Sequence, residues 1–298
     1  MSDVQTVLYD VPGPRARRRA LIGTVLALVA IAALVGVALL RLADRGQFDM
    51  DLWGPWVDPS TDEFGQVWSL VGRGLLATLI AAALAILLSL AVGVVLGVGR
   101  MMSPGLLKTP FVVFIELFRG LPVVITIFLV WRVLVELERS TGVGIGWLPG
   151  DDPLWWLVIG LTLYNSVIIA EILRAGVASL PRGQAESALA VGMTRGQAMR
   201  FVQLPQAFRT MLPALVSQLV VILKDTSLVA VIGLGYQELL DRGNQISLNL
   251  DNPIQSLLIV GAIYIVINYA LSRLAIYIER RLSRSGMEAG GEDAVPAT

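Results

Sequence analysis

The segment "GQAESALAVGMTRGQAMRFVQLPQ", residues 183–206, is a patterned polar stretch between two hydrophobic runs. It carries Glu186, Arg195 and Arg200 together with four glutamines. The runs on either side, residues 154–175 and 211–232, have the length of about 20 residues that crosses a bilayer as a helix. The presence of a long, patterned loop on one side of the membrane therefore needs an explanation.

The composition indicates an all-α polytopic membrane protein. The chain has 298 residues, of which 55% are hydrophobic and 15% charged, whereas soluble domains carry about 25% charged residues. Because lipid offers no hydrogen-bonding partners, apolar spans must pair their backbone groups internally as helices. Six spans are predicted, at residues 20–40, 67–98, 107–134, 154–175, 211–232 and 254–278.

The positive charges predict the orientation, because cytoplasmic loops collect Lys and Arg. With the N-terminus inside, the inner segments hold Arg15, Arg17, Arg18, Arg19, Arg100, Lys108, Arg182, Arg195, Arg200, Arg209, Arg280, Arg281 and Arg284. The outer loops hold only Arg45, Arg139 and Arg242. Both termini and the quoted loop are therefore expected in the cytoplasm. The first run is interpreted as an uncleaved span, since a cleaved signal peptide usually has a shorter apolar core.

The chain lacks Cys and His, which excludes thiol chemistry, imidazole bases and the usual zinc sites. No metal site and no catalytic residue are predicted. It also lacks the Gly-x-x-x-x-Gly-Lys-Ser/Thr loop that cradles phosphates, so it is not expected to hydrolyse ATP. An intramembrane enzyme stays a remote alternative, for which Lys224 and Ser227 have the i, i+3 spacing of a dyad.

The loop itself predicts two short helices joined at a corner. The first covers residues 182–192, with Ser179 as a cap, Pro181 in the first turn and Gly192 as a left-handed end. The second covers residues 195–202 and stops at Pro205. An exposed apolar stripe is predicted, formed by Ala188, Leu189, Val191 and Met193. Such a stripe fits either a protein-binding surface or a helix pair lying on the inner leaflet.

Glu186-Ser187-Ala188, Gly192 and, after nine residues, Val202-Gln203-Leu204-Pro205 resemble the "EAA" loop of permease subunits in bacterial ABC importers. Ser187 and Val202 depart from the family form. The resemblance implies that residues 185–192 are a coupling helix that inserts into the ATP-hydrolysing subunit. The coupling residues so implied are Ala185, Glu186, Ser187, Ala188, Leu189, Gly192 and Pro205.

Three further stretches resemble the polar amino-acid branch of these permeases, over roughly residues 67–282: "ELFRGLPVVITIF", "AEILRAGVASLPRGQAESA" and "LPQAFRTMLPALVSQLVVILKDTSLVAVIG". The resemblance implies a type I ABC importer permease fold in a bacterial cytoplasmic membrane. It also implies ATPase subunits that bind ATP and Mg²⁺, a second permease subunit, identical or homologous, and an extracytoplasmic solute-binding protein. The resemblance further implies an amino-acid cargo and a surrounding lipid membrane, and neither a nucleic-acid partner nor a cofactor of this chain is expected.

These arguments divide the chain into five consecutive parts, one of which contains the coupling loop. They are a basic cytoplasmic N-terminus (1–19), an extra transmembrane helix (20–42), an extracytoplasmic segment (43–66), the permease domain (67–282), the coupling loop within it (179–209) and a disordered cytoplasmic tail (283–298).

Ionisable residues at membrane depth are costly and usually face a bundle interior or a wet cavity. Glu116 and Arg119, and likewise Glu171 and Arg174, have the i, i+3 spacing of an ion pair across one helical turn. Both pairs fit structural or gating roles, and Glu116, Arg119 and Glu171 are also candidates for substrate contact.

The stretch "LKDTSL" places Lys224, Asp225, Thr226 and Ser227 near the middle of the fifth span, and Gln218 lies two turns before Asp225. A zwitterionic amino acid needs an acceptor for its ammonium group and donors for its carboxylate, which these residues could supply. An interhelical or dimer-interface network explains them equally well.

Glutamate or glutamine is the favoured cargo, because the resemblance points to such importers and because Arg73 and Arg132, near the outer ends of their spans, would attract anions. The alternative function is a gradient-driven secondary transporter or channel. That class often shows paired repeats with interrupted helices, and no such repeat is evident.

Overall fold

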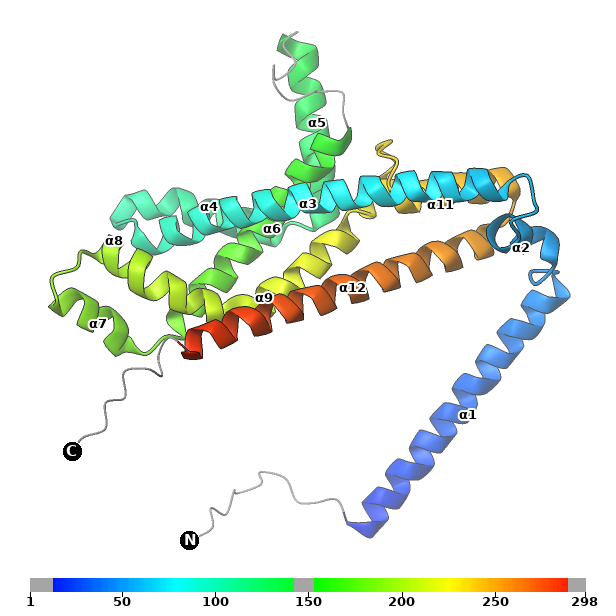
Figure 1. Ribbon diagram of the computed structural model, residues 1–298, viewed down its shortest axis with the longest axis horizontal. Helices are drawn as coiled ribbons and strands as arrows, with labels where there is room; N and C mark the ends of the chain where they lie inside the picture. Colours follow the sequence, from blue (N-terminus) through cyan, green and yellow to red (C-terminus); the bar gives the residue numbers. More distant parts are fainter. Residues whose placement is uncertain (1–12, 142–152, 289–298) are drawn as a thin grey trace. The chain divides into compact units, whose positions relative to one another are not determined.

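The computed structural model describes residues 13–141 and 153–288, and every regular element among them is a helix (Figure 1). The predicted tail beyond residue 288, the loop at 142–152 and the first twelve residues lie outside the described residues. The chain divides between Thr61 and Asp62 into two compact units, which are described separately.

The first unit contains α1 (Pro14–Asp44) and α2 (Met50–Val57). Pro14 stands in the first turn of α1, where its missing N–H costs nothing. The 31 residues of α1 have an apolar window of mean hydropathy 2.7, and none of them is buried. At 1.5 Å per residue α1 is about 46 Å long, so this helix alone is long enough to cross a bilayer, as its sequence predicts.

The second unit is built on α3 (Phe64–Met102), a continuous helix of 39 residues. Small residues recur on one face of α3 at every fourth position and are buried there: Ala81, Ala85, Ser89, Gly93 and Gly97. Small residues at this spacing let two membrane helices approach closely. This face packs against α6 (Pro153–Ala178), the most buried of the candidate spans.

The helix α6 lies at the centre of the second unit, where it contacts α3, α5 and α9. Leu157, Leu161 and Ile169 along it are almost wholly buried. The C-terminal half of the unit consists of α9 (Leu204–Asp225), α10 (Leu228–Ile232), α11 (Leu239–Leu250) and α12 (Pro253–Glu288). In this half α12 packs on α9 and α11, and α11 packs on α3.

The predicted third span, residues 107–134, is broken into two helices. The structure has a short 3₁₀ turn η1 (Gly105–Lys108), then α4 (Thr109–Gly120) and α5 (Val123–Thr141). The helix axis bends by 112° between the two halves of the span. Pro122 is the cause, because a proline pushes the preceding residue out of the helical region, and Leu121 has ψ 139°. Figure 1 shows α5 projecting away from α3 and α4.

The segment before the fifth span also differs from the prediction. The loop contains α7 (Arg182–Ala190) and α8 (Arg195–Gln197), and α8 runs through a π-helical segment η2 (Ala198–Gln203) directly into α9. Pro205 therefore does not stop the helix. A π-helical turn widens the backbone spiral, and widening directly before Pro205 relieves the clash of its ring with the preceding turn. Counting α4–α5 as one broken span, up to six spans remain.

We expect Gly93→Ala to destabilise the second unit, because a Cβ at position 93 would lie 2.7 Å from Ile169 Cγ2 and 2.9 Å from the carbonyl oxygen of Ser166. Overpacking of this kind costs about 1–3 kcal/mol. The measurement is thermal unfolding of the purified protein in detergent, followed by tryptophan fluorescence. Gly72→Ala on the same helix is the matched control, since nothing lies within 4 Å of its Cβ. An equal melting temperature for Gly93→Ala and the control would contradict the close α3–α6 packing.

Candidate functional site

The corner of the quoted loop is made by local hydrogen bonds. Gly192 has φ +86°, a left-handed conformation that glycine adopts without a Cβ penalty. The N–H of Met193 donates to the carbonyl of Ala188 at 3.1 Å, and the N–H of Gly192 donates to that of Leu189 at 3.0 Å. This paired arrangement is the Schellman motif, so the predicted left-handed end of the first helix is confirmed.

A capping box begins the second helix directly after the corner. The N–H of Gln197 donates to Thr194 Oγ1 at 3.3 Å, and the N–H of Thr194 donates to Gln197 Oε1 at 2.8 Å. The predicted cap at Ser179 is wrong, because its hydroxyl donates to the carbonyl of Gly176 within the last turn of α6. Pro181 occupies the N-cap position of α7 instead. The angle between the two loop helices is thus fixed by residues 188–197.

The predicted exposed stripe is only partly correct. Leu189 is 44% exposed and Val191 is 75% exposed, but Ala188 is only 5% exposed. Ala188 is covered because α7 folds back onto the π-helical segment η2, a long-range contact that the local sequence pattern does not reveal. Glu186 and Ser187 remain exposed. The outer face of α7 therefore combines Glu186 and Ser187 with two apolar side chains.

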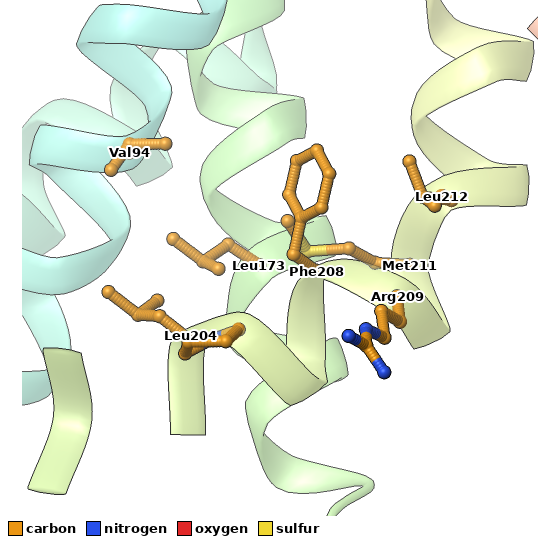
Figure 2. A pocket seen from close by; sticks show the side chains of 8 residues that line it. Val94, Leu173, Leu204, Phe208, Arg209, Met211 and Leu212 are labelled. Carbon is orange, nitrogen blue, oxygen red and sulfur yellow. The ribbon is translucent and has the colours of Figure 1, made fainter. Parts of the chain in front are cut away.

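An apolar crevice lies where α9 begins, next to the loop. Figure 2 shows Val94 from α3 and Leu173 from α6 facing Leu204, Phe208, Met211 and Leu212 of α9, with Arg209 at its edge. Its volume is about 480 Å³. The start of α9 is therefore incompletely packed against α3 and α6, which leaves room for it to shift.

Ion pairs join α3, α4 and α6 near the C-terminal end of α3. Arg100, in the last turn of α3, donates to Glu171 of α6 and lies 3.6 Å from Glu116 of α4. The Nε of Arg174 lies 3.0 Å from Glu171, which confirms the predicted pair on α6. The predicted Glu116–Arg119 pair is not formed in the described structure, because Glu116 pairs with Arg100. Sequence spacing suggests only intrahelical pairs, whereas this network spans helices.

The polar residues of the fifth span fall into two groups. Gln218 is 9% exposed and its Nε2 donates to Asn165 Oδ1 of α6 at 2.6 Å, and Asn165 in turn donates to the carbonyl of Leu161 at 2.9 Å. Gln218 thus takes part in an interhelical bond. Sequence reasoning missed Asn165, although an asparagine inside an apolar run is itself a signal.

Two residues of the second group line a cavity of about 500 Å³. The helix α9 ends at Asp225 and α10 begins at Leu228, so the "LKDTSL" stretch is a break in the span. Lys224 and Ser227 line the cavity together with Tyr264 and Asn268 of α12. Thr226 is fully buried and does not line it, and Asp225 does not line it either. Sequence reasoning did not single out the two residues of α12.

The buried carboxylate of Glu238 holds one wall of this cavity, Tyr264, in place. Glu238 is fully buried and caps α11 by accepting hydrogen bonds from the N–H groups of Leu240 and Asp241, both at 2.8 Å. It also accepts a bond of 2.7 Å from the hydroxyl of Tyr264. Burial raises the pKa of Glu238, while the bonds from Leu240, Tyr264 and Asp241 oppose that shift. Tyr264, a wall of the cavity, is therefore anchored to α11.

Comparisons with known proteins agree on one family. Residues 89–284 match the family described as the binding-protein-dependent transport system inner membrane component. The glutamate transport system permease protein of Corynebacterium glutamicum is 37% identical over 242 residues, which cover 81% of this chain and 83% of that protein. The arginine transport system permease protein of Bacillus subtilis is 32% identical over 214 residues, 70% of this chain and 91% of that protein. The crystal structure of an amino acid ABC transporter with histidines superposes with a TM-score of 0.63 at 30% identity, over 74% of this chain and 99% of that chain.

We expect Arg100→Gln to destabilise the inner end of the second unit, because it leaves the half-buried carboxylate of Glu171 without one of its two cationic partners. An unsatisfied group of this kind costs roughly 2 kcal/mol. Thermal unfolding of the purified protein in detergent measures the effect, and Arg73→Gln near the start of α3 is the control. Restoring the stability of Arg100→Gln by adding Glu171→Gln would support the pair. Equal melting temperatures for Arg100→Gln and the control would refute it.

Proposed function

The chain belongs to the family of inner-membrane components of binding-protein-dependent transport systems, and on that premise we propose that it is the permease subunit of an ABC importer for polar amino acids, with glutamate the leading candidate. Its apolar helices and its family make it a multi-pass protein of the cytoplasmic membrane. The relatives named above carry glutamate in one case and arginine in the other, which supports an amino-acid cargo.

The observation that carries the proposal is the shape of the loop. The nine-residue helix α7 ends at the left-handed Gly192 and presents Glu186, Ser187, Leu189 and Val191 outward. An exposed mixed surface of this kind suits insertion into a cleft of another protein. We propose that the other protein is an ATPase subunit, which would bind ATP and Mg²⁺, since this chain has no phosphate-binding loop.

Motion of α7 would reach the membrane helices by two routes. One is the short link from α7 back to α6, the central helix of the unit. The other runs through the contact of α7 with η2, which is continuous with α9, and through the hydrogen bond of 3.1 Å between Gln206 and Gln184. The crevice of Figure 2 gives the start of α9 the space to respond. This arrangement fits rigid-body rocking of the bundle.

The cavity beside Lys224 is the proposed substrate contact within the span. Its ammonium group would attract the carboxylate of an amino acid, and Ser227, Tyr264 and Asn268 would add hydrogen bonds. Asp225 follows Lys224 in the sequence but does not line this cavity, so the oxygens of Ser227 and Asn268 would be the acceptors for the ammonium group of the substrate. The hydroxyl group of Ser227 already donates to the carbonyl of Lys224 at 2.8 Å, so its oxygen would act as an acceptor.

We further propose that two such subunits, identical or homologous, enclose one pathway, and that a solute-binding protein delivers the substrate from outside. Both termini and the coupling loop would then lie in the cytoplasm, in line with the distribution of Lys and Arg. The test is uptake by proteoliposomes that contain the permease, its ATPase and its binding protein. ATP-dependent accumulation of glutamate is the expected result, and uptake that persists without the ATPase would instead favour a gradient-driven transporter.

We expect Gly192→Ala to lower ATP-dependent uptake about tenfold while membrane insertion remains normal. A Cβ at φ +86° costs about 1–2 kcal/mol, which shifts the corner away from the geometry that the ATPase would engage. Glu186→Lys, which reverses a charge on the exposed face of α7, should have the same direction of effect. Uptake and ATPase rates are measured side by side.

Gly196→Ala is the matched control, because its Cβ would have no neighbour within 4 Å and its backbone is not left-handed. Normal uptake by both Gly192→Ala and Glu186→Lys, at normal expression, would contradict a mechanical role for the loop.

We expect Lys224→Gln to raise the KM for glutamate uptake about tenfold or more, because it removes the positive charge from the cavity wall. Lys108→Gln is the control, since Lys108 is the only other lysine in the chain and lies on η1. Assays of initial uptake rate against substrate concentration provide the comparison. An unchanged KM for Lys224→Gln would remove this cavity from the pathway.

A further inference from the structure

A second polar cavity lies between α4 and α6, away from Lys224. Its volume is about 320 Å³ and its walls are Arg119, Val167, Ile168, Glu171 and Arg174. That size falls at the lower end of the range of small-molecule pockets. Two guanidinium groups and one carboxylate therefore meet around a space large enough for a small solute.

The hydrogen-bonding capacity of this cavity is only partly used. Arg174 donates through Nε to Glu171 Oε2 at 3.0 Å, so its two terminal amino groups have no recorded partner in the described structure. Arg119 takes part in none of the ion pairs or hydrogen bonds found among the described residues. A guanidinium group has five N–H donors in a planar fork that matches a carboxylate. The cavity thus offers two free forks.

The charges of the cluster do not balance. Arg100, Arg119 and Arg174 carry three positive charges, and Glu116 and Glu171 carry two negative charges. The excess is one positive charge, and the side chains of Arg119 and Arg174 are exposed, so this charge is accessible to a bound anion. An anion in the cavity would remove the excess and would receive the free N–H groups.

We propose that this cavity is an inner binding site for an acidic amino acid, at the end of the pathway that leads to the coupling loop; this inference rests on the proposed function. The two carboxylates of such a ligand match the two guanidinium groups. Its ammonium group matches Glu171, because a carboxylate has about four acceptor positions and Arg100 and Arg174 occupy one on each oxygen.

The charge balance also sets an order of preference. Glutamate, with a net charge of −1, brings the cluster of five side chains and ligand to zero. Glutamine leaves one positive charge and arginine leaves two. The site should therefore bind glutamate more tightly than glutamine, and glutamine more tightly than arginine.

The absence of cysteine from the chain allows a local test. Ile168→Cys would place the only thiol in the wall of the cavity, where its rate of reaction with a small anionic methanethiosulfonate can be measured in the full-length permease in phosphatidylcholine nanodiscs. We expect glutamate to slow this reaction at least fivefold, glutamine less, and arginine hardly at all. Leu106→Cys, which lies on η1 at a residue 88% exposed, is the control thiol that glutamate should not protect.

Adding Arg119→Gln to Ile168→Cys should raise the glutamate concentration for half-protection about tenfold, a change of about 1.4 kcal/mol in binding free energy. Arg119→Lys, which keeps the charge but loses the fork, should give a smaller increase. Arg132→Gln on α5 should leave the protection unchanged. Equal protection in Arg119→Gln and in Ile168→Cys alone would overturn the proposal, even if the complete importer transports glutamate.

A lipid phosphate is the competing source of an anion. If nanodiscs that contain phosphatidylglycerol block the thiol without any amino acid, and glutamate does not displace that block, the site belongs to lipid and the proposal fails. If glutamate protects the thiol but the complete importer transports no amino acid, the binding site stands and the proposed function fails. The two ideas can therefore be rejected separately.

Discussion

The close contact of α3 with α6 is the constraint on which the rest of the second unit depends. At Gly93 and Gly97 there is no space for a side chain, since a Cβ there would lie within 3.0 Å of atoms of α6. In lipid, helices gain little from hydrophobic contact alone and associate through such close packing. Because α6 is held in this way, Asn165 faces Gln218 on one side and Glu171 faces Arg100 on the other. The interhelical bond at Gln218 and the ion pairs at Arg100 thus depend on the orientation of one central helix.

The loop at residues 179–209 is also positioned by α6. The link from α6 to α7 is short, and α7 then folds back onto η2, so the loop is held at both ends by helices of the bundle. Local bonds fix the corner at Gly192, while the crevice beside Phe208 leaves the start of α9 loosely packed (Figure 2). Because the corner at Gly192 is held by local hydrogen bonds and the start of α9 is loosely packed, a displacement of α7 would pass to α9 and would not deform the corner.

Features that depend on local chemistry could be predicted from the sequence. The number of spans, the left-handed Gly192 and the Glu171–Arg174 pair follow from run length, glycine conformation and i, i+3 spacing. The break at Pro122 could have been found, because Leu121 precedes a proline inside an apolar run, and so could the repeat of small residues at every fourth position on α3. The burial of Ala188 and the pairing of Arg100 with Glu116 could not. Both depend on where distant helices lie, which no local pattern encodes.

The polar residues of the spans divide by whether their partners lie within the chain. Gln218, Asn165 and Glu238 have hydrogen-bond partners within the chain, and satisfied buried groups rigidify a structure. Lys224 and Arg119 instead line cavities without an ion pair among the described residues. A positive charge that the chain leaves uncompensated in a membrane span must be balanced by a bound solute, a lipid or a neighbouring subunit. Lys224 lines one cavity, and Arg119 and Arg174 line the other, so under the proposed function an anionic cargo would meet a matching charge in each. A cationic cargo would be repelled in both, so under the proposed function the permease helices would contribute to selectivity for charge together with the binding protein.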